Sequence, residues 1–223
     1  MQFTFHENSG DATLKIDGDL HKYLFKVRRH DSTKNLYFRN MEDDILYEYK
    51  ISTTSRRDTT LELISQILKP IKPKKELHIG WCIIDIKNIE KVIASLNEIG
   101  VTKITFIRCS YSQNNIKINY DKLNKILINS SSQSGRSDKI VLDEIDSLNQ
   151  FQELYSDSYM FNFSKNNIQD NINDIKIIVL GCEGGFSSEE VAQYNSNQIV
   201  GIDSNMILKS ETAVITIASK ILL

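Results

Sequence analysis

A short apolar run that passes directly into glycines is the feature that most constrains the fold of this chain. Ile175–Leu180 has the composition of a strand buried on both faces, which is typical of a parallel sheet. Three of the five residues 181–185 are glycine. Ser187 and Glu190 then match a capping box, in which two side chains satisfy backbone N–H groups at a helix start. The stretch predicts a strand, a glycine loop and a helix of an α/β sheet.

Strand-like and helix-like segments alternate through the rest of residues 76–223. Apolar residues between Ile89 and Ile99 recur at helical spacing, and Gly100 follows them where a helix C-cap belongs. Leu123, Ile126 and Leu127 mark a second helix, and Ala213–Leu223 a final one. The other expected strands are Glu76–Ile84, Val101–Cys109, Lys139–Leu142, Tyr159–Phe163 and Gln198–Ile202. This alternation predicts an α/β domain with a mostly parallel sheet.

The two prolines of the chain, Pro70 and Pro73, lie among lysines in residues 69–75, and this composition favours an extended linker. Before it, short alternating segments separated by Asp, Asn and Gly predict a small β-barrel. These segments are Ala12–Ile16, Asn35–Arg39 and Leu46–Ile51. We therefore expect one domain over residues 1–68, a linker over 69–75 and a second domain over 76–223.

Composition excludes several classes of protein. With 223 residues, 40% hydrophobic and 25% charged, the chain is long and apolar enough to bury a core. It has neither an apolar run of the roughly 18 residues that span a membrane nor a basic, apolar leader at its start. Cys82, Cys109 and Cys182 are odd in number and widely spaced, which argues against a zinc site and against a disulfide framework. We expect a cytoplasmic protein without a metal or a membrane partner.

Charge is divided unevenly along the chain. Residues 1–75 carry a net charge of +3 and residues 76–223 a net charge of −5. The positive part holds five of the seven arginines. Such a surface permits contacts with nucleic-acid phosphates, although a solvated basic face explains it equally well.

A second loop lies near the first in the expected sheet. After the strand Gln198–Ile202, Met206–Leu208 would be exposed beside the glycine-rich strand end. Helix capping alone explains Ser210 and Glu211, and a tight turn alone explains the glycines. Neither explains the exposed apolar residues, and an apolar slot lined by backbone groups suits a cofactor that carries a purine.

Residues 181–190 (GCEGGFSSEE) and 207–213 (ILKSETA) resemble the RsmE family of 16S ribosomal RNA uridine-N3 methyltransferases, in the SPOUT superfamily. Residues 132–136 (SQSGR), 99–101 (IGV) and 21–28 (HKYLFKVR) are similar to further blocks of that family. The resemblance implies a PUA-like N-terminal β-barrel and a C-terminal SPOUT α/β domain with a trefoil knot. It also implies S-adenosylmethionine as cofactor, 16S rRNA of the small ribosomal subunit as substrate, and a homodimer.

The resemblance further implies roles for particular residues. Glu183 and Glu211 are candidates for base or positioning work, and Arg136 for contact with phosphate or a developing anion, with a surface ion pair as the alternative. Lys22, Arg28 and Arg29 would hold the RNA backbone. The expected cofactor-binding residues are Leu180, Gly181, Gly184, Gly185, Ile202, Ile207, Leu208, Ser210 and Thr212.

The chain also departs from the family pattern. Cys182 replaces a usual proline, Ser204–Met206 replaces Gly-x-Arg, and Lys209 replaces an arginine. Two alternatives therefore remain: a SPOUT methyltransferase that acts on transfer RNA, and a non-catalytic RNA-binding or ribosome-assembly protein. His78 and Trp81, in a strand-like segment, are expected to be core residues.

Overall fold

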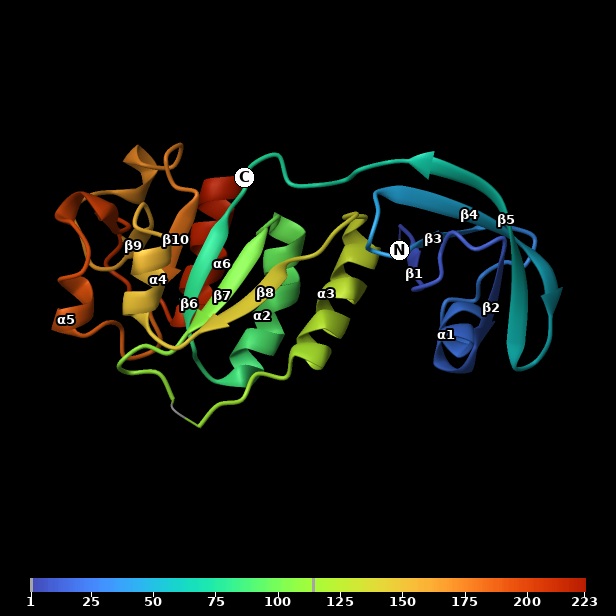
Figure 1. The fold of residues 1–223 in the computed structure, drawn as a ribbon, viewed down its shortest axis with the longest axis horizontal. Helices are drawn as coiled ribbons and strands as arrows, with labels where there is room; N and C mark the ends of the chain where they lie inside the picture. Colours follow the sequence, from blue (N-terminus) through green and yellow to red (C-terminus); the bar gives the residue numbers. More distant parts are fainter. Residues whose placement is uncertain (1, 114) are drawn as a thin grey trace. The chain divides into compact units, whose positions relative to one another are not determined.

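The computed structural model describes residues 2–113 and 115–223, which divide into two compact units (Figure 1). The first unit comprises the residues up to Lys72 together with Ser131–Lys139. The second comprises Pro73–Ser130 and Ile140–Leu223. The division at Lys72 falls inside the expected linker. Sequence reasoning did not predict that residues 131–139 group with the N-terminal part.

The first unit contains a five-stranded sheet in the order β1-β3-β4-β5-β2. Its elements are β1 (Thr4–Phe5), β2 (Thr13–Asp17), α1 (Gly18–Lys22), a π-helical segment (Tyr23–Val27), β3 (Leu36–Arg39), β4 (Ile45–Thr54) and β5 (Asp58–Leu68). β1 pairs with β3 in parallel, and the other pairs are antiparallel. Along β2 the side chains alternate, so that Leu14 and Ile16 enter a small core with Phe38, Tyr49 and Leu61.

The three strands expected in this part are present as β2, β3 and β4. The long strand β5 and the helix α1 were not predicted. β4 and β5 form a hairpin with two register shifts, between Glu48 and Tyr49 and between Ile51 and Thr53. Such irregularities bend a strand and increase its twist, so the sheet curls over its core.

The second unit contains a six-stranded parallel sheet in the order β11-β9-β10-β6-β7-β8. Its elements are β6 (His78–Cys82), α2 (Ile86–Ile99), β7 (Lys103–Ile107), α3 (Tyr120–Ser134), β8 (Val141–Ile145), α4 (Leu148–Leu154), β9 (Tyr159–Phe161), β10 (Ile177–Leu180), α5 (Ser188–Val191), β11 (Ile199–Val200) and α6 (Ser210–Leu222). The mostly parallel sheet expected from the alternation of strands and helices is confirmed.

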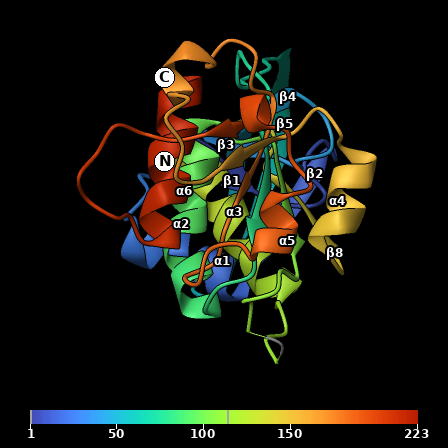
Figure 2. The same ribbon diagram turned by 90° about the vertical axis from the view of Figure 1, so that its left-hand side faces the viewer.

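Helices cover both faces of this sheet (Figure 2). β6 shows the two faces, because successive side chains of a strand point in opposite directions. Gly80 faces α4, where an added Cβ would lie 2.7 Å from the Phe151 ring. Trp81 faces the other way and donates a hydrogen bond to Ser210 of α6. α2 packs on the α6 side, so β6 and β10 are buried on both faces.

The boundaries of α2 follow from local chemistry. The Asp85 carboxylate accepts a hydrogen bond from the Lys87 N–H at the helix start. Gly100 ends the helix with a φ of 111°, and its N–H bonds to the Leu96 carbonyl. A residue with a Cβ is strained in that conformation, so the predicted glycine C-cap is confirmed.

One expectation from the cysteines is wrong. Cys82 and Cys109 form a disulfide with a Cα–Cα distance of 5.6 Å, and Cys182 is free and buried. Spacing along the chain could not indicate this pair, because it is the adjacency of β6 and β7 in the sheet that brings the two residues together. Within residues 2–113 and 115–223, no helix combines the length and the apolar character that crossing a bilayer requires.

Candidate functional site

A cavity of about 310 Å³ opens at the carboxyl ends of β9, β10 and β11. Ligands of open α/β sheets bind at this edge. The cavity is lined by Phe161, Asn162, Phe163, Ser164, Leu180, Gly181, Cys182, Gly185, Phe186, Ile202, Ser204, Met206, Ile207, Leu208, Ser210 and Ala213. Its walls are mainly apolar and carry a few hydroxyl and backbone groups, which is the usual make-up of a small-molecule site.

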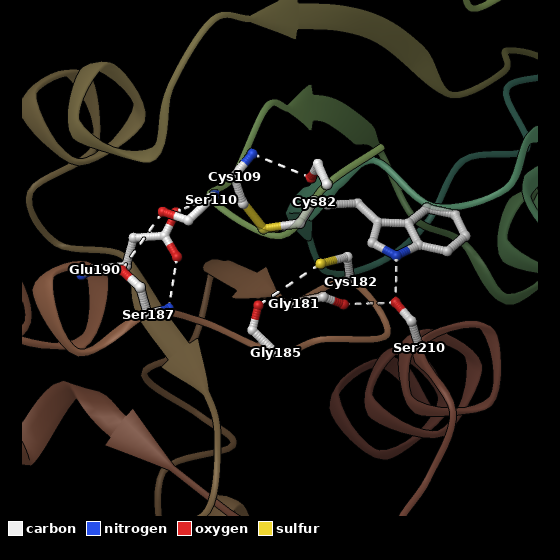
Figure 3. Close-up of a disulfide and its surroundings, with 11 residues drawn as sticks. Cys82, Cys109, Ser110, Gly181, Cys182, Gly185, Ser187, Glu190 and Ser210 are labelled. Atoms are coloured by element: carbon white, nitrogen blue, oxygen red, sulfur yellow. Dashed lines mark hydrogen bonds between the residues drawn. A yellow bond between two sulfur atoms is a disulfide. The ribbon is translucent and has the colours of Figure 1, made fainter. Parts of the chain in front are cut away.

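Ser210 joins three elements at the floor of this cavity (Figure 3). Its hydroxyl donates to the Gly181 carbonyl at 2.6 Å and accepts from the Trp81 indole N–H at 2.9 Å. The expected capping role of Ser210 is wrong, because Lys209 is the N-cap residue of α6 and Ser210 is the first helical residue. Trp81 is a core residue as expected, and it also holds the serine that anchors the glycine loop.

Residues 181–187 lead from β10 into α5, and they are called the cofactor loop here because the sequence predicts that they bind a cofactor. The predicted capping box is confirmed: the Ser187 hydroxyl accepts from the Glu190 N–H, and the Glu190 carboxylate accepts from the Ser187 N–H. The second oxygen of Glu190 accepts from the Ser110 N–H at 2.8 Å. Glu190 therefore ties the end of the cofactor loop to the segment that follows β7.

The end of β9 and the residues after it form another wall, for which the sequence predicted only a strand over Tyr159–Phe163. Phe161–Ser164 lines the cavity. Gly201, which follows β11, lies so close that an added Cβ would be 2.5 Å from the Ser164 carbonyl oxygen. The Gly201 N–H bonds to the Asn166 carbonyl, and the Ile168 N–H bonds to the Gly201 carbonyl. A glycine at the end of a predicted strand was the one signal of this close approach.

Three large apolar side chains form the rim of the cavity. Phe163 is 83% exposed, Met206 is 75% exposed and Ile207 is 80% exposed. The sequence predicted exposure at residues 206–208, and it is confirmed for Met206 and Ile207. Single exposed apolar residues are ordinary, whereas three around one cavity mark a surface that suits a ligand.

Most of the residues expected to bind a cofactor lie together here. Seven of the nine line the cavity: Leu180, Gly181, Gly185, Ile202, Ile207, Leu208 and Ser210. Gly184 faces Tyr111 instead, where an added Cβ would lie 2.8 Å from the tyrosine Cβ. Thr212 is exposed on α6. Sequence reasoning missed the residues that come from β9, and it did not count Cys182, Phe186 or Ala213.

The two candidate glutamates have different environments. Glu183 is exposed on the cofactor loop and does not line the cavity. Glu211 lies in the first turn of α6, next to Ser210, and it does not line the cavity either. Its Oε2 atom is buried and has no hydrogen-bond partner within the described part of the chain. Burial raises the pKa of the Cys182 thiol, which keeps this wall of the cavity uncharged.

The other candidate residues belong to the first unit. Arg136 is 5% exposed, and its Nε donates to the Asp138 carboxylate at 2.5 Å. Lys22 pairs with Asp19 at 3.0 Å. Arg28 donates to the Tyr23 hydroxyl and lies over its ring, and Arg29 is exposed. In neither unit do the described residues bring three or more His, Cys, Asp or Glu side chains together as a metal site.

Comparison with known proteins gives matches that together cover nearly the whole chain. Residues 71–222 match the model of the RNA methyltransferase domain family. The chain is 32% identical to ribosomal RNA small subunit methyltransferase E of Helicobacter pylori, over 98% of both chains. It is 24% identical to the protein of that name from Aquifex aeolicus, over 97% of this chain and 96% of the other.

Solved structures share the fold at lower identity. A Legionella pneumophila protein described as a methyltransferase, with the cofactor SAM bound, has a TM-score of 0.76 and 21% identity over 98% of this chain and 95% of the other. The ribosomal RNA small subunit methyltransferase E of Neisseria gonorrhoeae, bound to S-adenosyl methionine, has a TM-score of 0.75 and 16% identity over the same shares. The match over residues 71–222 and the full-length identity to the Helicobacter protein show that this chain belongs to the ribosomal RNA small subunit methyltransferase E family.

Proposed function

We propose that this protein transfers the methyl group of S-adenosylmethionine to N3 of a uridine in the 16S rRNA of the small ribosomal subunit. The observation that carries the proposal is the apolar cavity at the ends of β9, β10 and β11, closed by the cofactor loop. Two solved relatives of the same fold were crystallised with this cofactor. The family's name supplies the substrate class.

The residues of the cavity fit such a cofactor. A volume of about 310 Å³ is at the lower end of the range for small-molecule sites. Apolar walls from Leu180, Ile202 and Leu208 suit a flat purine, and neighbouring backbone groups suit its ring nitrogens. Gly201 and Ser164 approach so closely that any side chain at residue 201 would displace the β9 wall.

When bound, the cofactor supplies an activated methyl group on a positively charged sulfur. The protein must then hold the uracil N3 in line with that methyl group and keep water out, so positioning is its main contribution. The N3 proton also has to leave, which requires a base or a group that stabilises the anion. Glu211 is the better candidate, because its Oε2 is buried and unpaired within the described residues. Glu183, which is exposed, would contact the RNA.

The first unit would hold the RNA. Lys22, Arg28 and Arg29 are exposed and basic, and they suit contact with the phosphate backbone. For Arg136 we retain the role of holding a phosphate or the developing anion. Its replacement by lysine should lower kcat more than the affinity for the cofactor, because lysine keeps the charge but loses the planar fork.

Finer features of the fold belong to the same proposal. The curled sheet of the first unit would be a PUA-like barrel over residues 1–68, and the domain over 76–223 would contain a trefoil knot. Membership of the family supports the knot, because the resemblance to that family implies one. We also propose that the protein acts as a homodimer in the cytoplasm, where its substrate is made.

The test is methyl transfer from labelled S-adenosylmethionine to small subunits purified from cells that lack this gene. Wild-type protein should produce N3-methyluridine at one site, identified by mass spectrometry of the nucleosides. The same assay with transfer RNA should give no product. Transfer to transfer RNA alone would assign the chain a different substrate, and no transfer to either RNA would contradict the proposal.

A matched pair of variants connects the activity to the cavity. Ile207→Asp places a charge on the rim and should abolish most transfer, because the cofactor would meet a carboxylate in place of an apolar wall. Leu154→Asp makes the same change at a similarly exposed residue of α4, outside the cavity, and should match wild type. Equal activity of the two variants would remove the cavity from the mechanism.

A further inference from the structure

The disulfide joins two neighbouring strands at the edge of the sheet that carries the cavity. Cys82 is the last residue of β6, and Cys109 follows β7 by two residues. β6 and β7 are paired in parallel, with Cys82 opposite Ile107. The bridge therefore fixes the chain just beyond the end of β7, where a loop leaves the sheet (Figure 3).

This loop, residues 109–112, is called the support loop here. The Cys109 N–H donates to the Ser112 hydroxyl at 3.1 Å, and the Ser112 N–H donates to the Cys109 carbonyl at 3.0 Å. Both bonds involve the backbone of the bridged cysteine, which donates the first and accepts the second. The conformation of the support loop thus depends on where Cys109 is held.

The support loop contacts the cofactor loop and the helix α5 that follows it at three places. The Ser110 N–H donates to Glu190, which closes the capping box. Tyr111 packs against Gly184. The Ser110 hydroxyl also donates to the Ser187 hydroxyl at 3.5 Å, at the end of the cofactor loop. Figure 3 shows the bridge, Ser110 and Glu190 in sequence on one side of the cofactor loop.

We propose that Cys82 and Cys109 are a reversible redox pair that controls the affinity of the cavity for S-adenosylmethionine. This inference rests on the proposed function for the identity of the cofactor. With the bridge formed, the support loop is fixed and holds the cofactor loop in shape. With the bridge reduced, Cys109 is free to move, the three contacts weaken and cofactor affinity falls.

A second cavity provides access to the pair. It has a volume of about 560 Å³ and is lined by Cys109, together with Arg108, Ser110, Asp146 and other residues. Cys82 is fully buried and Cys109 is 4% exposed, so an attacking thiol reaches Cys109 first. Glu189 and Glu190 also line this cavity, and with Asp146 they outnumber the one arginine. A neutral dithiol should therefore enter more easily than an anionic one.

The pair is oxidised and reduced by thiol–disulfide exchange, with a small disulfide as the oxidant and a small dithiol as the reductant. In oxidation, the Cys109 thiolate attacks the small disulfide, forms a mixed disulfide and releases one small thiol. The Cys82 thiolate then attacks the Cys109 sulfur and releases the second small thiol. Two electrons pass from the protein to the reagent, and the two protons of the cysteines end on the released thiols. Disulfides of cytoplasmic proteins are characteristically transient and regulatory, which agrees with a reversible pair.

Cys182 takes no part in this exchange. Its thiol is buried and its pKa is raised, whereas the thiolate is the reactive form of cysteine. It remains a wall of the cavity.

The test compares oxidised and reduced wild-type protein. One sample is treated with bis(2-hydroxyethyl) disulfide, which is neutral and acyclic, and the other with reduced dithiothreitol, and mass spectrometry after alkylation counts the free thiols in each. Calorimetric titration with S-adenosylmethionine then gives Kd for both. We expect one free thiol and tight binding in the oxidised sample, and three free thiols with Kd about tenfold higher in the reduced sample.

Variants separate the bridge from other thiols. Cys109→Ala and Cys82→Ala each remove the pair, and each should bind with the affinity of the reduced wild type whatever the treatment. Two variants are used because either alanine leaves a small gap in the core. Cys182→Ala changes the cavity wall, but it should keep the same ratio between the two treatments.

The outcomes distinguish this inference from the proposed function. Equal Kd values for oxidised and reduced wild type would overturn the redox control while the methyltransferase proposal stands. A redox response that persists in Cys109→Ala would also overturn it, as would three free thiols after oxidation. Absence of binding in both samples would contradict the proposed function itself.

Discussion

At the scale of single residues, Ser210 connects α6 to β6 and to the cofactor loop through two hydrogen bonds of its hydroxyl. It lies 6% exposed between the Trp81 indole N–H and the Gly181 carbonyl, and it satisfies both. A buried polar group without a partner is costly, so this serine makes it possible for a tryptophan and a glycine loop to meet in an apolar core. The position of the cofactor loop therefore depends on a side chain of α6.

We predict that Ser210→Ala lowers the free energy of unfolding by about 1–3 kcal/mol, because it leaves two buried groups unpaired. Trp81→Phe removes the donor alone. In the double variant the loss of stability should be smaller than the sum of the two single losses, because both substitutions break the same hydrogen bond. Urea unfolding of the four proteins measures this coupling, and strictly additive losses would show that the two residues are independent.

His78 is a second residue with a measurable consequence. It is 8% exposed, its Nε2 lies 2.8 Å from the Thr105 hydroxyl, and it packs against Phe151 and Tyr155. Burial, aided by the Lys103 charge and opposed by Asp143, lowers its pKa from 6.5 to about 4. The core histidine expected from the sequence is confirmed.

This pKa makes stability depend on pH. Between pH 6.5 and about 4 the unfolded chain binds a proton at His78 that the native protein does not bind. The free energy of unfolding should therefore fall as the pH is lowered through this window, by up to about 1.4 kcal/mol per pH unit from this group. His78→Phe should lose this part of the slope, although its stability at neutral pH will also be lower. An unchanged slope in urea titrations would assign the effect to other groups.

At the scale of elements, two serine N-caps offer a controlled comparison. Ser187 caps α5 and Ser147 caps α4, and each hydroxyl accepts a backbone N–H. Replacing either by alanine should cost about 1 kcal/mol of stability. Only Ser187→Ala should raise the Kd for S-adenosylmethionine, because only α5 continues the cofactor loop. A similar rise in Ser147→Ala would mean that general stability, not the loop, controls binding.

The elements that could be predicted from sequence are those whose burial leaves a regular pattern of apolar residues. β6 and β10 have both faces covered and are mainly apolar, and α2 has a periodic apolar face with a glycine at its end. β5 was missed because only its first half is buried, and residues from Ile64 to Leu68 are largely exposed. Its hydrophobic pattern is therefore that of a polar loop with scattered apolar residues.

The parts of the candidate site that consist of consecutive residues could be predicted from the sequence. The parts that depend on contacts between distant segments could not. Residues 180–185 and 202–210 could be identified because each loop directly follows a strand-like segment. The wall from Phe161 to Ser164 and the bridge of Cys82 to Cys109 depend on the order of strands in the sheet. That order is set by packing between distant segments, and periodicity within one segment contains no information about it.

At the scale of the whole molecule, cofactor binding should protect one unit more than the other. The cavity is formed by residues of the second unit alone. At a cofactor concentration 100 times Kd, mass action stabilises the binding unit by about 2.7 kcal/mol. We predict slower amide hydrogen exchange in β9, β10, β11 and α6, with no change in β2 to β5. Mass spectrometry of peptides from both units measures this, and equal protection in the two would contradict it.

The first unit is assembled from two separate stretches of sequence, since Ser131–Lys139 belongs with the residues before Lys72. The Gln2 N–H bonds to the Ser132 carbonyl, and the Ser137 hydroxyl bonds to Asp44. A chimaera that exchanges residues 1–72 alone would keep residues 131–139 of the original chain, and it would lose the Ser137–Asp44 hydrogen bond if the new domain lacks that aspartate. A transferable N-terminal unit therefore has to include residues 131–139, although residues 73–130 separate them from the rest of that unit along the chain.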